Sequence, residues 1–410
     1  MRILMIAQFY PPVIGGIEVH VAALARDLVK RGHEVAVATF ATDTDPRGVR
    51  IDEGVRVHAL QVAVQRIGPL FASERRHAIP LPDPEAAASL LRLVREFRPD
   101  IVHAHNWLGR SYLPLKRHVG VPYLVSLHDS SRICTQARWM YRDREFCSGP
   151  SLSRCTRCCA VHFGALKGPV TYLGNRLARG AEAARVDFFL PVSRAVAESN
   201  RLAQDGLPFE VVPNFSVDIR EVPTPDYPRL YDLPTGPYLL FAGDVVAYKG
   251  ADALLDAYRQ LSAAPPLVLI GRVSEATRCA LPPGAIAVGP WPHELVLEAW
   301  RRCLLGVIPS IFLDPCPTTA YEAMAAGKAV VASARGGLLD QVADGVTGLL
   351  VPPGEPSALA AAIARLMSDS ELRERMGVAG RQRFLEKFES SVITTRIETL
   401  YRVQAGDRLG

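Results

Sequence analysis

Short apolar runs alternate with amphipathic helical stretches along most of this chain, and no other feature of the sequence constrains the fold as strongly. Residues 2–8 form an apolar run, apolar residues between 19 and 29 recur at helical spacing, and residues 34–39 form a second apolar run. Strand, helix and strand in this order imply parallel pairing through right-handed crossovers. The sequence therefore predicts an α/β fold with buried parallel strands.

The alternation stops at a proline-rich segment and then begins again. The apolar run at 238–242 is followed by a helix at 251–261 and by strands at 267–270, 285–288, 306–308 and 329–332. Two such rounds predict two doubly wound, Rossmann-like lobes that face one another across a cleft, with ligands at the carboxyl ends of the strands. We place the first lobe at 1–215, a linker at 216–236, the second lobe at 237–385, and a helix within 386–410 that crosses back to the first lobe.

Composition fits this plan. A chain of 410 residues accommodates two or three domains, and 49% hydrophobic with 22% charged residues supplies buried cores and excludes low-complexity disorder. The longest apolar stretches, such as 304–313, run about ten residues, short of the roughly 20 that a membrane helix needs. Only Arg2 precedes the apolar residues 3–9, and no cleavage site follows them. We therefore expect a buried first strand and a cytoplasmic protein.

The positive charge is concentrated in the first half. Residues 1–218 carry 28 Lys and Arg against 21 Asp and Glu, whereas residues 219–410 carry 19 against 21. The first lobe could therefore meet an anionic partner, such as a phosphate or an acidic membrane surface; an ordinary solvated surface is the alternative. The same two readings apply to Lys167–Val186, where arginines lie among apolar residues and peripheral membrane attachment is one option. Basic residues are dispersed, so nucleic acid is not expected.

Two motifs of the first lobe lie where strands should end. Gly15 and Gly16 form a turn between a strand and a helix, where the backbone can approach a ligand and the helix N-terminus can bind an anion. A purely steric role for these glycines is the alternative. His128 and Asp129 follow the strand expected at 123–127, and His128 could donate a hydrogen bond to a substrate hydroxyl or leaving group. We expect His103 to pack within its strand.

The second lobe carries the denser set of polar motifs. Lys249 lies in a loop that begins at Gly243, between a strand and a helix, where an ammonium group can neutralise phosphate. Asp314 precedes a helix and Glu322 lies on it, so the two carboxylates can contact different parts of one extended ligand. The N-terminus of that helix, near Thr318 and Thr319, suits a pyrophosphate.

Together these motifs make the chain similar to the retaining glycosyltransferases of family 4, which have the two-lobed GT-B architecture. The resemblance covers nearly the whole length and rests on the motifs at 15–18, 128–129, 249–250, 314–327 and 336–337. It implies a UDP- or GDP-linked sugar donor bound mainly by the second lobe. It also implies an unknown hydroxyl acceptor bound by the first lobe, and an acceptor carried on a membrane lipid would match the basic charge there.

The resemblance also implies individual roles. His128 would hydrogen-bond the transferring sugar, Lys249 would stabilise the diphosphate, Asp314 would contact sugar hydroxyls, and Glu322 would hold the ribose. The leaving phosphate would help to deprotonate the acceptor, so transfer would need no cofactor. The residues that would bind the donor are Gly15, Gly16, Gly243, Lys249, Pro317, Thr318, Thr319 and Glu322.

Three positions depart from the family pattern. Asp244 stands where the family often has an arginine, which removes a phosphate-binding cation unless Arg272 or Arg335 substitutes. Asp314 and Asp340 each stand where glutamate is more usual. These differences put the identity of the donor in doubt more than the type of reaction.

A cysteine-rich insert lies at about 132–162. Its Cys155-x-x-Cys158 spacing is typical of a zinc site, and Cys134 and Cys147 could complete four tetrahedral thiolate ligands. Reduced thiols without a metal are the alternative. A structural zinc would brace a loop that overhangs the acceptor side.

Two other functions stay open at this point. A non-catalytic sugar-nucleotide-binding protein is one, favoured by Asp244, and a sugar-nucleotide epimerase with the same architecture is the other.

Overall fold

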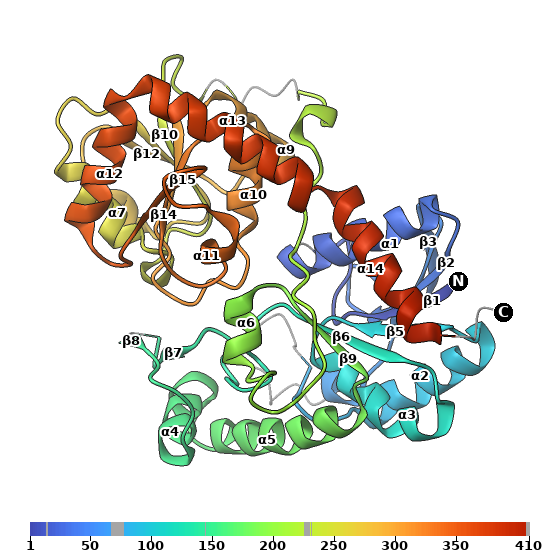
Figure 1. Ribbon diagram of the computed structural model, residues 1–410. Coiled ribbons are helices and arrows are strands. Elements are labelled where there is room, and N and C mark those ends of the chain that lie inside the picture. Colours follow the sequence, from blue (N-terminus) through green and yellow to red (C-terminus); the bar gives the residue numbers. More distant parts are fainter. Residues whose placement is uncertain (14, 67–77, 144, 225–229, 231, 407–410) are drawn as a thin grey trace. The chain divides into compact units, whose positions relative to one another are not determined.

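The computed structural model describes residues 1–13, 15–66, 78–143, 145–224, 230 and 232–406. These residues form two compact units (Figure 1). The first comprises Met1–Pro213 and the segment from Ile393 onward, and the second comprises Asn214–Val392. The division falls two residues before the expected end of the first lobe, and the described part of the expected linker is grouped with the second unit. Residues 225–229 and 231 of that linker lie outside the described residues.

The first unit is built on a seven-stranded sheet in the described part of the chain. All its strand pairs are parallel except the edge pair β3–β4, which is antiparallel. The expected strands at 2–8, 34–39, 101–103 and 123–127 are all present. In order across the sheet, the strands are β3 (Gly48–Asp52), β4 (Val55–Leu60), β2 (Glu34–Phe40), β1 (Arg2–Ile6), β5 (Ile101–Ala104), β6 (Tyr123–Leu127) and β9 (Phe188–Pro191).

Helices cover both faces of this sheet (Figure 1). On one face lie α1 (Gly16–Lys30) and α14 (Ser390–Ala405), and on the other lie α2 (Pro84–Phe97), α3 (Leu113–Val119) and α5 (Lys167–Arg185). The cysteine-rich insert forms the short hairpin of β7 (Met140–Tyr141) and β8 (Glu145–Phe146) and then α4 (Leu152–Phe163). A short helix, α6 (Arg194–Ser199), follows β9.

The helix expected within 386–410 corresponds to α14, and a separate helix precedes it. Helix α13 (Ser370–Lys387) ends first, and α14 begins at Ser390. The side chain of Glu389 accepts a hydrogen bond from the backbone N–H of Ser391 at 2.9 Å and so caps the new helix. Within the first unit, Tyr401 of α14 hydrogen-bonds His103 Nδ1 at 2.6 Å, which fixes this helix on the sheet.

The second unit has a six-stranded, all-parallel sheet in the described residues. The strands are, across the sheet, β12 (Ala285–Gly289), β11 (Leu267–Ile270), β10 (Leu239–Ala242), β13 (Leu305–Ile308), β14 (Val330–Ser333) and β15 (Gly348–Val351). The last of these was not anticipated. Helices α7 (Ala251–Arg259) and α12 (Pro356–Ser368) cover one face, and α9 (His293–Arg302), α10 (Thr318–Ala325) and α13 cover the other (Figure 1). Two short helices, α8 (Glu275–Cys279) and α11 (Leu338–Gln341), lie in connections.

Both sheets have a topological switch point, where successive strands diverge to opposite sides. In the first unit it lies between β1 and β5, and in the second between β10 and β13. Loops that follow such neighbouring strands separate and leave a crevice at their carboxyl ends, which is where ligands bind in open α/β sheets. The confirmed doubly wound topology therefore marks one candidate edge in each unit.

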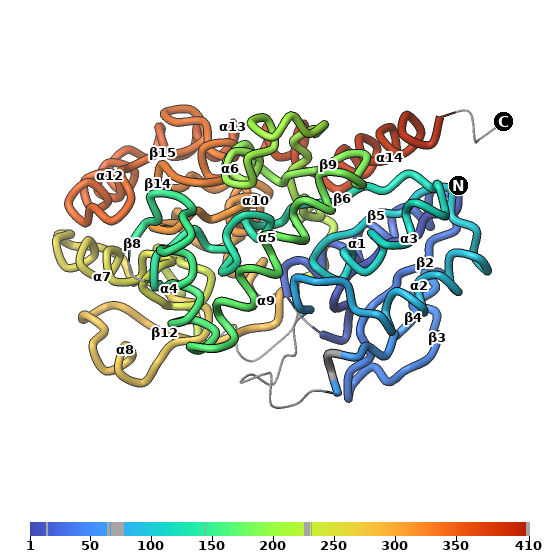
Figure 2. The backbone as a smooth tube through the Cα atoms, turned by 90° about the horizontal axis from the view of Figure 1, so that it is seen from below, coloured from blue at the N-terminus to red at the C-terminus, as the bar shows by residue number. Residues whose placement is uncertain are grey.

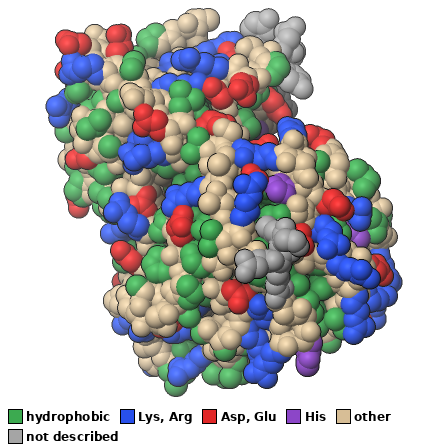
Figure 3. Space-filling model, turned by 45° about the vertical axis from the view of Figure 1, so that its right-hand side comes forward, with side chains coloured by type: hydrophobic (Ala, Val, Ile, Leu, Met, Phe, Trp, Pro, Cys, Tyr) green, Lys and Arg blue, Asp and Glu red, His purple; other side chains and the backbone are tan. Residues whose placement is uncertain are grey.

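The surface carries charged side chains of both signs (Figure 3). On the face shown in Figure 3, Lys and Arg side chains lie over both units, mixed with Asp and Glu side chains. Among the residues that the structure describes, every helix is too short or too polar to span a membrane.

Candidate functional site

The edge of the first unit begins with the Gly15–Gly16 turn. Gly15 is the N-cap of α1 and has extended backbone geometry, and no side chain caps this helix end. The N–H groups of the first helical turn have no partner within the helix, and the Glu18 carboxylate lies against Gly15, so an anion would meet these groups beside that carboxylate. A Cβ atom at Gly16 would meet no atom of the structure within 4 Å. Packing therefore does not require a glycine there, and the space fits the close approach of a ligand.

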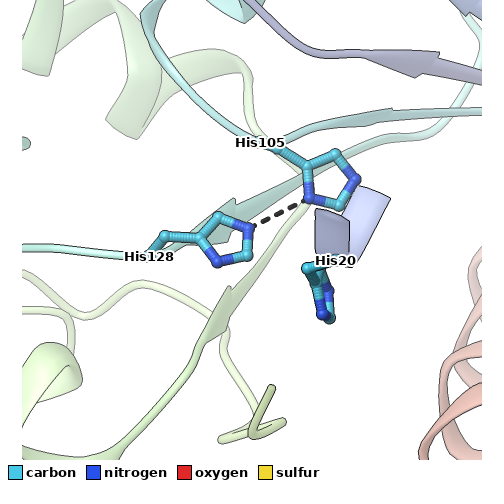
Figure 4. A group of neighbouring side chains, drawn as sticks. All are labelled: His20, His105 and His128. Atoms are coloured by element: carbon cyan, nitrogen blue, oxygen red, sulfur yellow. Dashed lines mark hydrogen bonds between the residues drawn. The ribbon is translucent and has the colours of Figure 1, made fainter. Parts of the chain in front are cut away.

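Three buried histidines lie at the same edge (Figure 4). His20 comes from α1, His105 follows β5 and His128 follows β6, and one ring nitrogen of each lies within 4.8 Å of the others. His105 Nδ1 and His128 Nε2 are 3.1 Å apart and share a hydrogen bond. Because one ring must donate and the other accept, His105 fixes the orientation of the His128 ring.

Burial keeps His20 and His105 uncharged at neutral pH. Desolvation lowers the pKa of His20 and of His105 well below the ordinary value, and the neighbouring histidines lower it further. His103 packs inside the sheet as expected, with Nδ1 bonded to Tyr401 and Nε2 bonded to Ser126 at 2.8 Å, and burial lowers its pKa to about 3. The first unit thus offers neutral hydrogen-bonding groups to a ligand.

Asp129 organises the turn that follows His128. Its carboxylate accepts a hydrogen bond from the backbone N–H of Ser131 at 2.8 Å, and its carbonyl accepts one from the Asn200 side chain at 2.8 Å. Burial raises the pKa of Asp129. These contacts hold the backbone at the end of β6 and so help to place His128.

The edge of the second unit is charged. Lys249 Nζ lies 2.8 Å from Asp314 Oδ2, and Ser310 Oγ donates to the same carboxylate oxygen at 2.9 Å. The Lys249 ammonium group also lies 5.0 Å from the centre of the Phe312 ring. Asp314 is buried, whereas 30% of the Lys249 side chain is exposed. The structure therefore brings two predicted site residues together at the switch point, with the ammonium group accessible.

The Gly336–Gly337 motif supports the loop that carries Asp314. A Cβ atom at Gly336, whose φ is +63°, would lie 2.4 Å from the Asp314 carbonyl oxygen, and one at Gly337 would lie 2.2 Å from the Pro315 carbonyl oxygen. Gly337 N–H donates to the Asp314 carbonyl at 2.7 Å. Only glycine permits this close approach, so the motif positions Asp314 from behind.

Glu322 forms a second, separate group on α10. It is buried, and its two oxygens accept hydrogen bonds from His293 Nε2 at 3.0 Å and from Trp300 Nε1 at 2.9 Å. Both donors come from α9. The hydrogen bond to Glu322 raises the pKa of His293. Thr318 begins α10 with Pro317 as its N-cap, and no side chain caps this end.

Sequence reasoning missed His293 and Trp300. Neither carries a motif, and their pairing with Glu322 joins residues that lie 29 and 22 positions apart. The position of His293 in the first turn of a helix, after Pro292, was the available signal.

Asp244 is paired with one of the two arginines considered as substitutes. Arg272 forms a bidentate contact with it, with Nε–Oδ1 at 2.9 Å and Nη2–Oδ2 at 2.5 Å. That hydrogen bond, together with the charges of Arg272 and Lys249, lowers the pKa of Asp244. The Arg272 side chain is 78% exposed. Arg335, in contrast, donates to the Ile311 carbonyl at 2.7 Å and supports the loop.

The four predicted metal-ligating cysteines gather around the β7–β8 hairpin and α4. The Arg142 N–H donates to Cys158 Sγ at 3.3 Å, and burial raises the pKa of Cys134 to about 12. All eight thiols are free. In the described part of the chain, only the histidine cluster places three or more such ligand atoms within 4.8 Å of one another. No three of these sulfur atoms therefore lie within 4.8 Å of one another, whereas Zn–S bonds of about 2.3 Å in a tetrahedron require S–S distances of roughly 3.8 Å.

Comparison with known proteins agrees with this geometry. Residues 14–219 match the profile of Glycosyltransferase Family 4, and residues 231–383 match that of Glycosyl transferases group 1. A glycogen synthase of Mycobacterium tuberculosis is 28% identical over 437 aligned residues, covering 98% of this chain and 94% of that protein.

Solved structures show the same fold. Sucrose-phosphate synthase from Thermosynechococcus elongatus superposes with a TM-score of 0.75 at 23% identity, over 98% of each chain. Anabaena HepE in complex with UDP-glucose superposes with a TM-score of 0.68 at 19% identity, over 98% of this chain and 99% of that one. This chain therefore belongs to glycosyltransferase family 4, whose GT-B enzymes transfer a sugar from a nucleotide-sugar donor with retention of anomeric configuration.

Proposed function

We propose that this chain transfers a hexosyl or N-acetylhexosaminyl group from a UDP-sugar to a hydroxyl acceptor. The observation that carries the proposal is the Lys249–Asp314 pair at the switch point of the second sheet. HepE, a structural neighbour, binds UDP-glucose, which favours UDP over GDP. The accessible Lys249 ammonium group comes just before α7, whose N-terminus has no side-chain cap, and this combination suits a diphosphate.

Lys249 would stabilise the negative charge that develops on the leaving diphosphate. In the absence of donor, Asp314 and the Phe312 ring hold its ammonium group in place. Asp314 would then accept hydrogen bonds from sugar hydroxyls. A group fixed before the reaction needs no reorganisation when charge develops, which is the main source of electrostatic catalysis.

Arg272 would supply the cation that Asp244 displaces. Its guanidinium group is exposed and lies at the carboxyl end of β11, next to the strand that leads to Asp244. Asp244 would hold Arg272 in position, and the amide groups near Gly243 would lie beside the same phosphates.

Glu322 would bind the ribose hydroxyls of the nucleotide. His293 and Trp300 fix the carboxylate, and each carboxylate oxygen keeps a further lone pair for a ribose hydroxyl. The uncapped N–H groups near Thr318 and Thr319 would face the pyrophosphate.

In the first unit, His128 would hydrogen-bond the transferring sugar, and the amides at Gly15 and Gly16 would approach the donor phosphates. During transfer the bond between the anomeric carbon and the phosphate oxygen breaks. The acceptor oxygen then bonds to the anomeric carbon on the same face, and its proton passes to the departing phosphate. The charge balances without a cofactor.

The test is a transfer assay across a panel of nucleotide sugars, with Lys249→Ala and Glu322→Ala as variants. We expect turnover of a UDP-sugar by the wild type and strong loss in both variants. Binding of donor without any sugar turnover in the wild type would instead identify a sugar-nucleotide-binding protein. Conversion of the donor into its epimer without transfer would identify an epimerase.

We also propose a structural zinc held by Cys134, Cys147, Cys155 and Cys158. The spacing of these cysteines, their placement on either side of one hairpin and on the helix that follows, and the N–H···S bond to Cys158 support it. The side chains would need to draw together around the ion.

Finally, we propose that the chain works on the cytoplasmic side of a membrane, with an acceptor linked to a lipid. The basic charge of residues 1–218 supports this location.

A further inference from the structure

Helix α5 carries a stripe of exposed apolar side chains. We call it the α5 stripe; its members are Leu166, just before the helix, and Val170, Leu173 and Leu177, with exposed fractions of 86%, 68%, 51% and 72%. Successive members are four, three and four positions apart, so they lie on one face. A continuous exposed apolar face of this kind marks an interaction site rather than scattered surface residues.

The opposite face of α5 is firmly packed, so the stripe belongs to a well-anchored helix. A Cβ atom at Gly168 would lie 2.3 Å from the carbonyl group of Cys159, which shows how closely α4 and α5 approach. Figures 1 and 2 both show the two helices side by side. Further along α5, Glu182 bonds the buried Arg110 side chain at 2.8 Å.

Basic residues outnumber acidic ones around the stripe, and of the acidic residues from neighbouring segments Asp205 pairs with Arg179 at 2.9 Å and Asp143 with His162 at 3.3 Å. Glu182 is the one acidic residue in 151–185, and it is buried against Arg110. The exposed residues Arg157 and Arg176 lie on α4 and α5, and Val161 of α4 adds a further apolar side chain that is 62% exposed. The basic residues of 151–185 are Arg154, Arg157, Lys167, Arg176, Arg179 and Arg185.

We propose that the α4–α5 hairpin docks on an anionic lipid surface, with the α5 stripe inserted at the level of the head groups and the arginines on lipid phosphates. A basic helical surface with an apolar face is the pattern that lies in a membrane interface. A second copy of this chain does not fit as the occupant, because two such hairpins would bring like charges together.

This inference rests on the proposed function only for its purpose, which is to bring the first unit to a lipid-linked acceptor. The docking itself depends on the hairpin alone. Because Cys155 and Cys158 lie on α4, the cysteine cluster would hold in place the helix against which α5 packs.

The experiment is vesicle flotation of the full chain. Vesicles of phosphatidylcholine mixed with phosphatidylglycerol are compared with phosphatidylcholine alone, at low and high salt. The test variants are the double substitutions Leu173→Asp with Leu177→Asp, and Arg157→Glu with Arg176→Glu. Matched controls are Val378→Asp on α13 and Arg365→Glu on α12, which are exposed positions of the second unit. Circular dichroism melts check that each variant folds.

We expect the wild type and both controls to float with the anionic vesicles and to be released by salt. Reversing two arginines should weaken binding at least about 20-fold, since each basic residue near such a surface contributes about fivefold. The aspartates in the stripe should remove binding altogether. Stripe variants that float like the wild type would overturn the proposal. Stripe variants that instead change the oligomeric state of the chain in analytical ultracentrifugation would identify the stripe as a dimer interface and overturn the proposal.

Donor turnover in the same preparations keeps the two proposals apart. If the wild type turns over donor but does not float with anionic vesicles, membrane docking is refuted and the proposed transferase activity stands. If the wild type floats in a salt-sensitive manner but turns over no donor, the proposed transferase activity is refuted and membrane docking stands.

Discussion

Apart from the antiparallel edge strand β3, the two sheets share one strand order, yet the side chains at their binding edges differ in charge. After β5 and β6, the first unit presents His105 and His128, which are buried and bonded to each other. After β10 and β13, the second unit presents the ion pair of Lys249 and Asp314. The same backbone crevice therefore serves two kinds of chemistry. Charged groups suit the diphosphate of the donor, whereas imidazoles that hydrogen-bond suit sugar hydroxyls.

We expect the largest loss of activity when the Lys249 ammonium group is removed from the second unit. We expect Lys249→Ala to lower kcat/KM for the donor about 10²–10³-fold, the usual cost of losing a group that stabilises transition-state charge. Lys328→Ala, outside this cluster, is the control and should behave like the wild type. Steady-state kinetics measures both. A Lys249→Ala variant within a few-fold of the wild type would contradict the assignment of this edge.

Glu322→Gln tests whether the carboxylate on α10 binds the donor. We expect KM to rise about tenfold or more, since a charged acceptor of ribose hydroxyls becomes a weaker neutral one. The pKa of His293 should also fall towards its ordinary value, because the hydrogen bond that raises it is weakened. Proton NMR of the His293 ring measures this shift.

The hydrogen bond between His293 and Glu322 predicts that the stability of the fold depends on pH. Since folding raises the pKa of His293, the pairing stabilises the fold fully below the ordinary value of 6.5 and loses this contribution as pH rises through the folded-state pKa. Glu322→Gln should therefore flatten that part of the stability profile in chemical denaturation. An unchanged profile would show that His293 and Glu322 do not share a proton-dependent bond.

Substitution of His105 in the first unit should have a smaller effect on activity. We expect His105→Ala to lower kcat about tenfold with little change in donor KM, because it removes the partner that orients His128. His105→Asn or His105→Gln, which can still hydrogen-bond, should recover part of the loss. A rise in KM with unchanged kcat would point to a structural role alone.

The smallest effect concerns the departure at Asp244. We expect Arg272→Ala to raise donor KM about tenfold at most, because its exposed guanidinium group acts through solvent. Asp244→Asn should have a lesser effect, since it loosens Arg272 without removing the cation. Equal KM values for all three proteins would mean that Lys249 alone neutralises the phosphates.

Sequence patterns were sufficient for the strands that are buried on both faces. Apolar runs such as 239–242 and 267–270 are unbroken and lie between turn residues, so their type and place could be predicted. Strand β15 was not predicted because its apolar run is only Leu349–Val351, between Gly348 and Pro352. Helix α13 was not predicted, and the Glu389 cap marks where α14 begins after it.

The site was predictable where chemistry sits in a local motif and unpredictable where it depends on pairing. Lys249, Asp314 and Glu322 lie in recognisable loops and helix starts. Their fixed geometry, however, comes from Ser310, His293 and Trp300, whose contacts depend on tertiary packing. The Asp244–Arg272 pair likewise joins the ends of two adjacent strands, which only the sheet order reveals.

The most direct test of the account is a crystal structure of the chain with an intact UDP-sugar. We predict that Lys249 Nζ and the Arg272 guanidinium group contact the diphosphate oxygens and that Glu322 accepts hydrogen bonds from the ribose. A nucleotide bound elsewhere, with the Lys249–Asp314 pair undisturbed and Glu322 contacting only His293 and Trp300, would contradict it.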